Sequence, residues 1–322
     1  MIETSGAVAS PFHGGELAVQ ERLGVKEKVA RFGERGIRPF MPDQHREFIE
    51  ELPFVFVASL DGEGQPWASM VWGLPGFVTT PDATTLKVAG NMAAGDPLSP
   101  NVVAGAPVGV LGIELETRRR NRVNGTVVDR NSEGFTVHVT QSFGNCQKYI
   151  QVRHPKYRRD PAVRTGAVPR LEGEHLSADA RRIVSAADTF FIASRSAHPA
   201  ESTHGEGADV SHRGGLPGFA ALADDGPATV ITFPDYVGNF LFNTLGNIQT
   251  DPRVGLLFVD FDHGSLLSLV GRAEIIWDGP EVSAVAGAQR LVRVTLRSGV
   301  LMDDALPFSF SEPSFAPQFR LG

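Results

Sequence analysis

Short apolar runs bounded by turn residues dominate the pattern of the chain. The runs at 54–60 and 189–195 have the length and the aromatic and β-branched content of strands. Each follows a segment with apolar residues at helical spacing, and Asp43 and Ser177 are the expected N-caps of these two helices. Short strands between frequent turns are typical of small barrels. Further strands are predicted at 66–72, 85–90, 107–115, 119–129, 134–140, 208–213, 228–233, 253–261, 265–276 and 290–296.

The second half of the chain repeats the first. The pentapeptide Gly73–Phe77 returns unchanged as Gly215–Phe219. Three other matches occur in the same order, and such order is difficult to obtain by chance. We therefore predict a mainly β protein with flanking helices, built as two tandem split β-barrels that form a pseudo-dimer. The expected parts are an N-terminal arm (1–42), a first barrel (43–152), a linker (153–176), a second barrel (177–300) and an extended tail (301–322).

Composition narrows the class of protein. With 322 residues and 42% apolar residues, the chain is long and apolar enough for about two globular domains. The net charge of −7 argues against a nucleic-acid or membrane-surface binder. The single cysteine, Cys146, excludes an internal disulfide, and the N-terminus has no secretory signal pattern. We expect a cytoplasmic protein without a membrane segment. Its arm should contain one amphipathic helix, at 16–32.

Several common chemistries have no motif here. The sequence contains no phosphate-binding loop ending in Gly-Lys-Ser/Thr, no Gly-x-Ser-x-Gly elbow and no His-Glu-x-x-His. The histidines are scattered, so no metal centre is expected. A Gly-rich insertion at 196–209 is interpreted first as a mobile loop or lid, and second as a metal or haem site.

Longer stretches of the second half resemble a known family. Residues 208–219, 234–239, 242–248 and 256–261 are similar to the FMN-binding split-barrel family related to pyridoxamine 5'-phosphate oxidase. The arm segments 12–17 and 37–44 resemble the leader of split-barrel modules found alone or fused to reductase domains. The resemblance implies a homodimer or a tandem pseudo-dimer, with FMN in the groove between two barrels.

The second copy is the better equipped to bind the flavin phosphate. A phosphate dianion favours cations, hydroxyls and amides near a helix N-terminus. The family's lysine is missing from the matching strand, where His212 and Arg213 stand, so the phosphate would have fewer cations. His212 has a structural alternative as a satisfied histidine, and Arg213 could pair with Asp209 or Glu206. The candidate phosphate-side residues are Ser211, His212, Arg213, Thr232, Asn239 and Asn243.

The first copy is expected to supply the ring side of the groove. In the family this strand carries a glutamine about four residues before a glycine, and Asn121 stands four residues before Gly125. Its neighbours Arg120 and Arg122 are further candidates, although a run of arginines can also protect a sheet edge. Residues 143–150 resemble a segment of the same modules, and a helix after Gly144-Asn145 would carry Lys148 and Tyr149. A cation near the flavin ring stabilises its anionic reduced form.

The leading hypothesis is an FMN-dependent oxidoreductase that transfers hydride through flavin N5 to or from an unidentified small molecule. Lys148 and His212 are the candidate catalytic residues. Haem or deazaflavin in the same groove, or a non-catalytic flavin-binding or partner protein, are the alternatives. A homodimer or a separate reductase is the expected partner. The opposite groove would need Ser69 and Leu267, which suit neither phosphate nor ring, so one cofactor per chain is expected.

Overall fold

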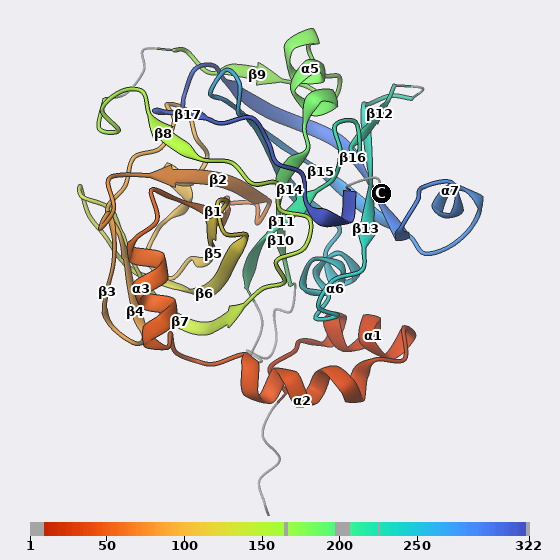
Figure 1. The fold of residues 1–322 in the computed structure, drawn as a ribbon, viewed down its shortest axis with the longest axis horizontal. Helices are drawn as coiled ribbons and strands as arrows, with labels where there is room; N and C mark the ends of the chain where they lie inside the picture. Colours follow the sequence, from red (N-terminus) through yellow and green to blue (C-terminus); the bar gives the residue numbers. More distant parts are fainter. Residues whose placement is uncertain (1–9, 164–166, 197–206, 225, 320–322) are drawn as a thin grey trace, which may run out of the picture.

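A computed structural model describes residues 10–163, 167–196, 207–224 and 226–319 of the protein (Figure 1). The chain is mainly β, with a large antiparallel sheet in each half. The first sheet has the spatial strand order β2-β1-β5-β6-β7-β4-β3. Its strands are β1 (Phe54–Leu60), β2 (Pro66–Trp72), β3 (Val78–Asp82), β4 (Thr85–Val88), β5 (Pro107–Glu114), β6 (Arg119–Arg130) and β7 (Phe135–Gly144).

The second sheet repeats this order as β11-β10-β14-β15-β16-β13-β12, with β9 added beside β16. Each strand of the first sheet therefore has one counterpart in the second, which confirms the internal repeat. Each sheet curls around its own apolar core. The strands are β9 (Arg170–Glu172), β10 (Thr189–Arg195), β11 (Ala208–Gly214), β12 (Ala221–Ala223), β13 (Val230–Tyr236), β14 (Arg253–Asp260), β15 (Ser265–Ile276) and β16 (Ala288–Met302).

The two halves pack through equivalent faces. The rings of Phe56 on β1 and Phe191 on β10 stack with centroids 3.4 Å apart. A Cβ on Gly109 would lie 2.5 Å from the Ala208 carbonyl oxygen, and a Cβ on Gly255 would lie 2.5 Å from the carbonyl oxygen of Pro66. Glycine at both positions lets the backbones of the two halves approach closely. These reciprocal contacts indicate a pseudo-twofold axis between the halves.

Short helices cover the sheets. Helix α5 (Ala178–Ala186) begins after Ser177, whose hydroxyl accepts a hydrogen bond from the backbone N–H of Ala180, so the predicted cap is confirmed. Helix α3 (Asp43–Glu50) begins one residue earlier than predicted, because Pro42 is the cap residue and Asp43 lies in the first turn. The other short helices are α4 (Leu98–Asn101), α6 (Asn243–Thr250) and α7 (Pro280–Ser283).

The N-terminal arm differs from its prediction. The single helix expected at 16–32 is two helices, α1 (Gly14–Arg22) and α2 (Lys26–Gly36). Gly24 lies between them with a φ of +66°, a left-handed conformation that ends α1 and turns the chain. Figure 1 shows α1 beside α6 of the second half, at the end of the molecule away from α5. Among the described residues, none of the helices is long and apolar enough to cross a lipid bilayer.

The linker and the tail also contain strands. Strand β8 (Pro155–Tyr157) from the linker pairs with β17 (Phe308–Phe310) from the tail. Strand β16 continues to Met302, past the boundary expected at 300. The tail ends, as far as it is described, in a 3₁₀ turn, η1 (Pro317–Phe319). The helix expected to carry Lys148 and Tyr149 is absent: these two residues form a turn, and Tyr149 has a left-handed φ of +68°.

Candidate functional site

A cavity lies where the two halves meet. It encloses about 850 Å³ of empty space, part of it open to solvent. The first half contributes β6 and the segment that follows β7, and the second half contributes β11, the end of β13 and the start of α6. Most of the candidate site residues line this cavity: Ser211, His212, Arg213, Asn239, Asn243, Arg120, Arg122 and Lys148.

Two candidates, Asn121 and Thr232, are not among the residues that line the cavity. Side chains alternate across a strand, so the neighbours Arg120 and Arg122 lie on the cavity side of β6 and Asn121 lies on the other. Thr232 lies within β13, opposite Arg293 of β16, whereas the cavity meets the end of that strand at 234–236. The repeat located Asn121 on the correct strand but on the face opposite to the cavity.

A buried polar network joins the halves at the cavity wall. Arg122 of β6 forms an ion pair with Asp209 of β11 at 2.9 Å and also donates to the hydroxyl of Ser211. Asn124 and Asn247 donate to the same Asp209 carboxylate at 2.8 and 3.2 Å. The charge of Arg122 is therefore balanced inside the protein, and its guanidinium positions Ser211 from the opposite half.

Arg120 is different, because no carboxylate of the described residues lies within ion-pair distance of it. Its Nε donates to the carbonyl oxygen of Cys146 at 2.6 Å. Burial lowers the pKa of Arg120 to about 9, and the nearby Arg213 and Arg122 contribute to that shift. Lys148, which is half-buried, likewise lacks a carboxylate partner among the residues that the structure describes.

The positive charge of Arg213 is only weakly balanced by a carboxylate. Its nearest carboxylate oxygen, on Asp235, lies 3.9 Å away, while the same carboxylate contacts Arg290 at 2.8 Å. Burial lowers the pKa of Arg213. Of the two partners expected for Arg213, Asp209 pairs with Arg122 instead, and Glu206 lies outside the described residues. The cavity thus carries a surplus of positive charge.

His212 is buried beside these cations. It is 3% exposed, and its Nε2 has no hydrogen-bond partner among the described residues. Burial, together with Arg120 and Arg213, lowers the pKa of His212 well below its usual value, so the imidazole is neutral at neutral pH. The neighbouring Gly214 allows this arrangement, because a Cβ there would lie 2.0 Å from the carbonyl oxygen of Tyr149.

Three residues that line the cavity have unusual backbone conformations. Tyr149, Phe240 and Phe242 line it, and all three have left-handed φ values between +63° and +68°. Such strain in non-glycine residues persists where the surrounding structure enforces it and is frequent at functional sites. Tyr149 also stacks on Tyr236 with ring centroids 5.0 Å apart, and Phe319 of η1 packs against both rings.

The pseudo-symmetric position in the other groove has different chemistry. There the repeat places Leu266 where the cavity has Arg120, and Met70 where it has His212; both are buried in the apolar layer between the halves. Ser69, the counterpart of Ser211, donates to Asp96 at 2.5 Å. Burial raises the pKa of Asp96 to about 6. An acidic, apolar environment does not suit a phosphate.

The sequence reasoning missed several cavity residues. Asp209 and Asp235, which balance the arginines, were not named as site residues, although each lies within a few residues of one that was. Tyr149 and Tyr236 lie in segments that resemble the family, but nothing in the sequence marked them or Phe240 as residues that line the cavity. In the described part of the chain, no group of three or more His, Cys, Asp or Glu residues is placed to hold a metal ion.

Residues 41–162 match the sequence profile of the family "Pyridoxamine 5'-phosphate oxidase". This segment is a pyridoxamine 5'-phosphate oxidase family domain. It spans the first sheet and β8, so the family domain contributes β6 and the 145–149 segment to the cavity. No curated protein matches the chain.

The solved structures that match the chain have low sequence identity to it. HupZ from Group A Streptococcus is 16% identical, with 40% of this chain and 97% of that chain covered and a TM-score of 0.30. A putative pyridoxamine 5'-phosphate oxidase from Lactobacillus delbrueckii is 12% identical, with 39% and 93% covered and a TM-score of 0.29. A FAD-binding protein from Mesorhizobium loti is 15% identical, with 42% and 98% covered and a TM-score of 0.25.

Proposed function

We propose that the protein is an FMN-dependent oxidoreductase whose cofactor binds in the cavity between the two halves. The observation that carries this proposal is the unbalanced positive charge of the cavity. Arg120 and Lys148 have no carboxylate partner among the described residues, and Arg213 shares a distant one with Arg290. Holding several cations together in a buried site is unfavourable unless an anion joins them.

The polar groups of the cavity fit a flavin phosphate. A buried Nε of Arg213 and the Nε2 of His212 have no hydrogen-bond partners within the described chain. Ser211 and the start of α6 supply a hydroxyl and backbone N–H groups beside them. Charged N–H donors, hydroxyls and helix N-termini are the usual phosphate ligands. Arg213 and Ser211 would therefore hold the phosphate, and Arg120 and Lys148 would lie toward the ring.

The chain's own residues would then bind and orient the FMN and polarise its ring. When bound, FMN supplies hydride transfer at its N5. Lys148 would keep a positive charge beside the ring, and neutral His212 could accept or release a proton at Nε2. The substrate is proposed to be a small molecule, with oxygen or a separate reductase as electron partner, and the protein is proposed to act in the cytoplasm.

Haem is a second candidate, and His212 favours it. A buried neutral imidazole with an unpartnered Nε2 has the chemistry of an iron ligand, so His212 would be the residue that holds the haem iron. The absorption spectrum of the purified protein separates the two: bands at about 370 and 450 nm indicate flavin, and a Soret band indicates haem.

Titration of the apo-protein with FMN tests the proposal quantitatively. We expect one equivalent of FMN per chain. Arg213→Ala should weaken binding by about 1.5–3 kcal/mol, or roughly 10- to 150-fold, the range for hydrogen bonds to charged groups. The exposed Arg272, on β15, provides a control variant, Arg272→Ala, that should bind as the wild type does. Absence of flavin binding, or an Arg213→Ala variant with unchanged affinity, would contradict the proposal.

A further inference from the structure

The N-terminal arm packs against the loop 237–242, which forms part of the cavity wall, on the side of the loop opposite to the cavity. Helix α1 crosses α6 at a glycine pair: a Cβ on Gly15 would lie 2.1 Å from the Gly246 carbonyl oxygen, and a Cβ on Gly246 would lie 2.6 Å from the backbone nitrogen of Glu16. These separations allow no side chain at either position. The start of α6, which lines the cavity, therefore rests directly on the backbone of the arm.

The loop itself is fastened to the arm by apolar and polar contacts. Leu241 is fully buried in a cluster with Phe12 and Phe143, and Phe240 packs against the same cluster. The carbonyl oxygen of Leu241 accepts a hydrogen bond from Gln20 Nε2 at 3.2 Å. The left-handed residues of the loop, Phe240 and Phe242, flank Leu241 on both sides. The arm therefore enforces the strained loop conformation that shapes the cavity wall.

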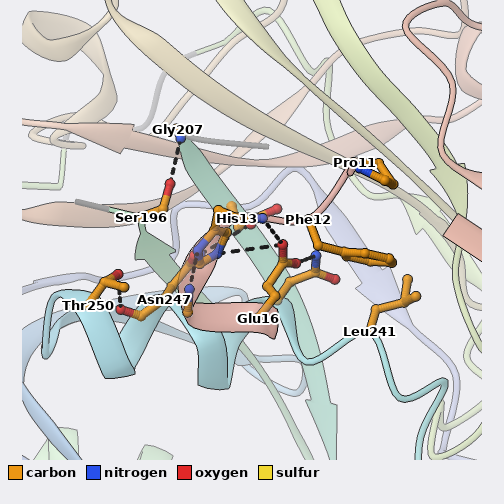
Figure 2. Close-up of polar contacts among 12 residues, drawn as sticks. Pro11, Phe12, His13, Glu16, Ser196, Gly207, Leu241, Asn247 and Thr250 are labelled. Carbon is orange, nitrogen blue, oxygen red and sulfur yellow. Dashed lines mark hydrogen bonds and ion pairs between the residues drawn. The ribbon is translucent and has the colours of Figure 1, made fainter. Parts of the chain in front are cut away.

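Glu16 connects the arm to a cavity residue. Its Oε2 accepts a hydrogen bond from the His13 backbone N–H at 3.0 Å, and its Oε1 accepts one from Asn243 Nδ2. Figure 2 shows His13 and Glu16 together, with Leu241 and Asn247 of the second half beside them. Glu16 is 2% exposed. Both oxygens of its carboxylate accept hydrogen bonds within the protein.

We propose that Glu16 is a positioning residue of the cofactor site. By accepting from the amide nitrogen of Asn243, it orients that amide so that Oδ1 is the polar atom offered to the cavity. The ligand group bound there must therefore carry a hydrogen-bond donor, such as a hydroxyl of the ribityl chain or a ring N–H. This inference rests on the proposed function for the identity of the ligand, but the hold of the arm on the loop does not.

A swap of two side chains tests the orientation. In Glu16→Gln, one oxygen still serves His13, while the amide NH₂ faces Asn243 and forces its amide to turn its own NH₂ toward the cavity. In Asn243→Asp, the new carboxyl group faces that of Glu16, and the N–H donor between them is lost. In the double variant Glu16→Gln/Asn243→Asp, the Gln NH₂ donates to the Asp carboxylate, whose other oxygen again faces the cavity. The swap also conserves the total formal charge.

A neutral group at position 16 is expected to fold. Gln has the size and shape of Glu, and its amide oxygen can accept the hydrogen bond from the His13 backbone N–H. Glu21→Gln is the matched control, because Glu21 lies on the same helix with its side chain 71% exposed, where its carboxylate forms a surface ion pair with Lys26.

FMN titration of these proteins is the first measurement. Each single variant should bind FMN about tenfold more weakly, the effect of one hydrogen bond of the wrong polarity, and the double variant should bind within about threefold of the wild type. Glu21→Gln should be unchanged. Equal affinities in all proteins, or a double variant no tighter than the weaker single variant, would overturn the inference.

Hydrogen exchange in the ligand-free protein separates this inference from the proposed function. The Leu241 N–H donates to Asn239 Oδ1 at 3.2 Å, and the Gly246 N–H donates to the Phe242 carbonyl at 2.7 Å. Both amides should exchange about tenfold faster in each single variant and recover in the double variant. If no protein binds FMN but this pattern appears, the proposed function fails and the positioning role stands. If exchange is the same in all proteins, the positioning role fails as well.

Discussion

Removing the charge of Arg120 should stabilise the ligand-free protein and weaken cofactor binding at the same time. The pKa of Arg120 is lowered to about 9 by burial and by neighbouring cations, and its ordinary value is 12.5. One pKa unit corresponds to about 1.4 kcal/mol, so keeping this guanidinium charged costs the folded protein on the order of 3–5 kcal/mol. Arg120→Gln removes that cost and can retain a donor for the Cys146 carbonyl. Loss of the present bond to that carbonyl offsets about 1 kcal/mol.

The expected outcome is a higher melting temperature with a lower affinity. A net gain of about 2–4 kcal/mol raises the Tm of a protein this large by about 3–6 °C. The same change removes a charged donor from the ring side of the proposed cofactor site, so FMN should bind roughly 10- to 150-fold more weakly. Thermal unfolding without ligand and flavin titration measure the two effects. The stability gap should narrow as the pH rises through about 9, because folded Arg120 then releases its proton while the unfolded chain keeps it.

Arg118 provides the contrast. It precedes β6, and its Nε donates to the Ile150 carbonyl at 2.9 Å, a backbone contact of the same kind, but Arg118 does not line the cavity. Arg118→Gln should lower the Tm or leave it unchanged, with no effect on affinity. If Arg120→Gln behaves as Arg118→Gln does, the charge of Arg120 serves the fold and the reasoning is refuted.

Other parts of the site give further predictions. Gly214→Ala should abolish flavin binding and lower the Tm, because the new Cβ meets the Tyr149 carbonyl, whereas Gly62→Ala, with open space around it, should do neither; equal behaviour of the two would refute this. Arg122→Met should destabilise the protein by about 3–5 kcal/mol in chemical unfolding, since Asp209 stays buried without its cation, and a loss below about 1 kcal/mol would count against it. Cutting the chain in the linker should leave neither half able to bind FMN in titration, and binding by one isolated half would disprove a shared site.

The strands were the most predictable part of the structure. Strands β1, β2, β10 and β15 begin and end where the apolar runs predicted, and the repeat gave the pairing of elements between halves. Short-range patterns are sufficient for this, because strand alternation and turn residues are local signals. The interruption of the arm helix at Gly24 was missed, since a glycine is tolerated within many helices and marks a turn only when its φ is positive.

The candidate site was predictable in composition and less so in geometry. The repeat and the family resemblance selected the strands that line the cavity. Asn121, proposed as a ring contact, is not among the lining residues, because an alignment of repeats does not report which way a strand side chain points. The contact between Glu16 and Asn243 had no signal in the sequence. Nothing local marks Glu16 as more than the third residue of a capping box, and its partner follows more than two hundred residues later.

The docking of the arm on α6 has a consequence for how the protein folds. Gln20 and Leu241 are 221 positions apart in the chain, and Glu16 and Asn243 are 227 apart. During synthesis the arm emerges before both sheets, and its apolar residues stay exposed until most of the second half has left the ribosome. Such distant contacts close slowly, because the entropy of a long loop is lost before any contact forms. The cavity wall is therefore expected to be completed late in folding, when both sheets already exist and the arm closes over α6.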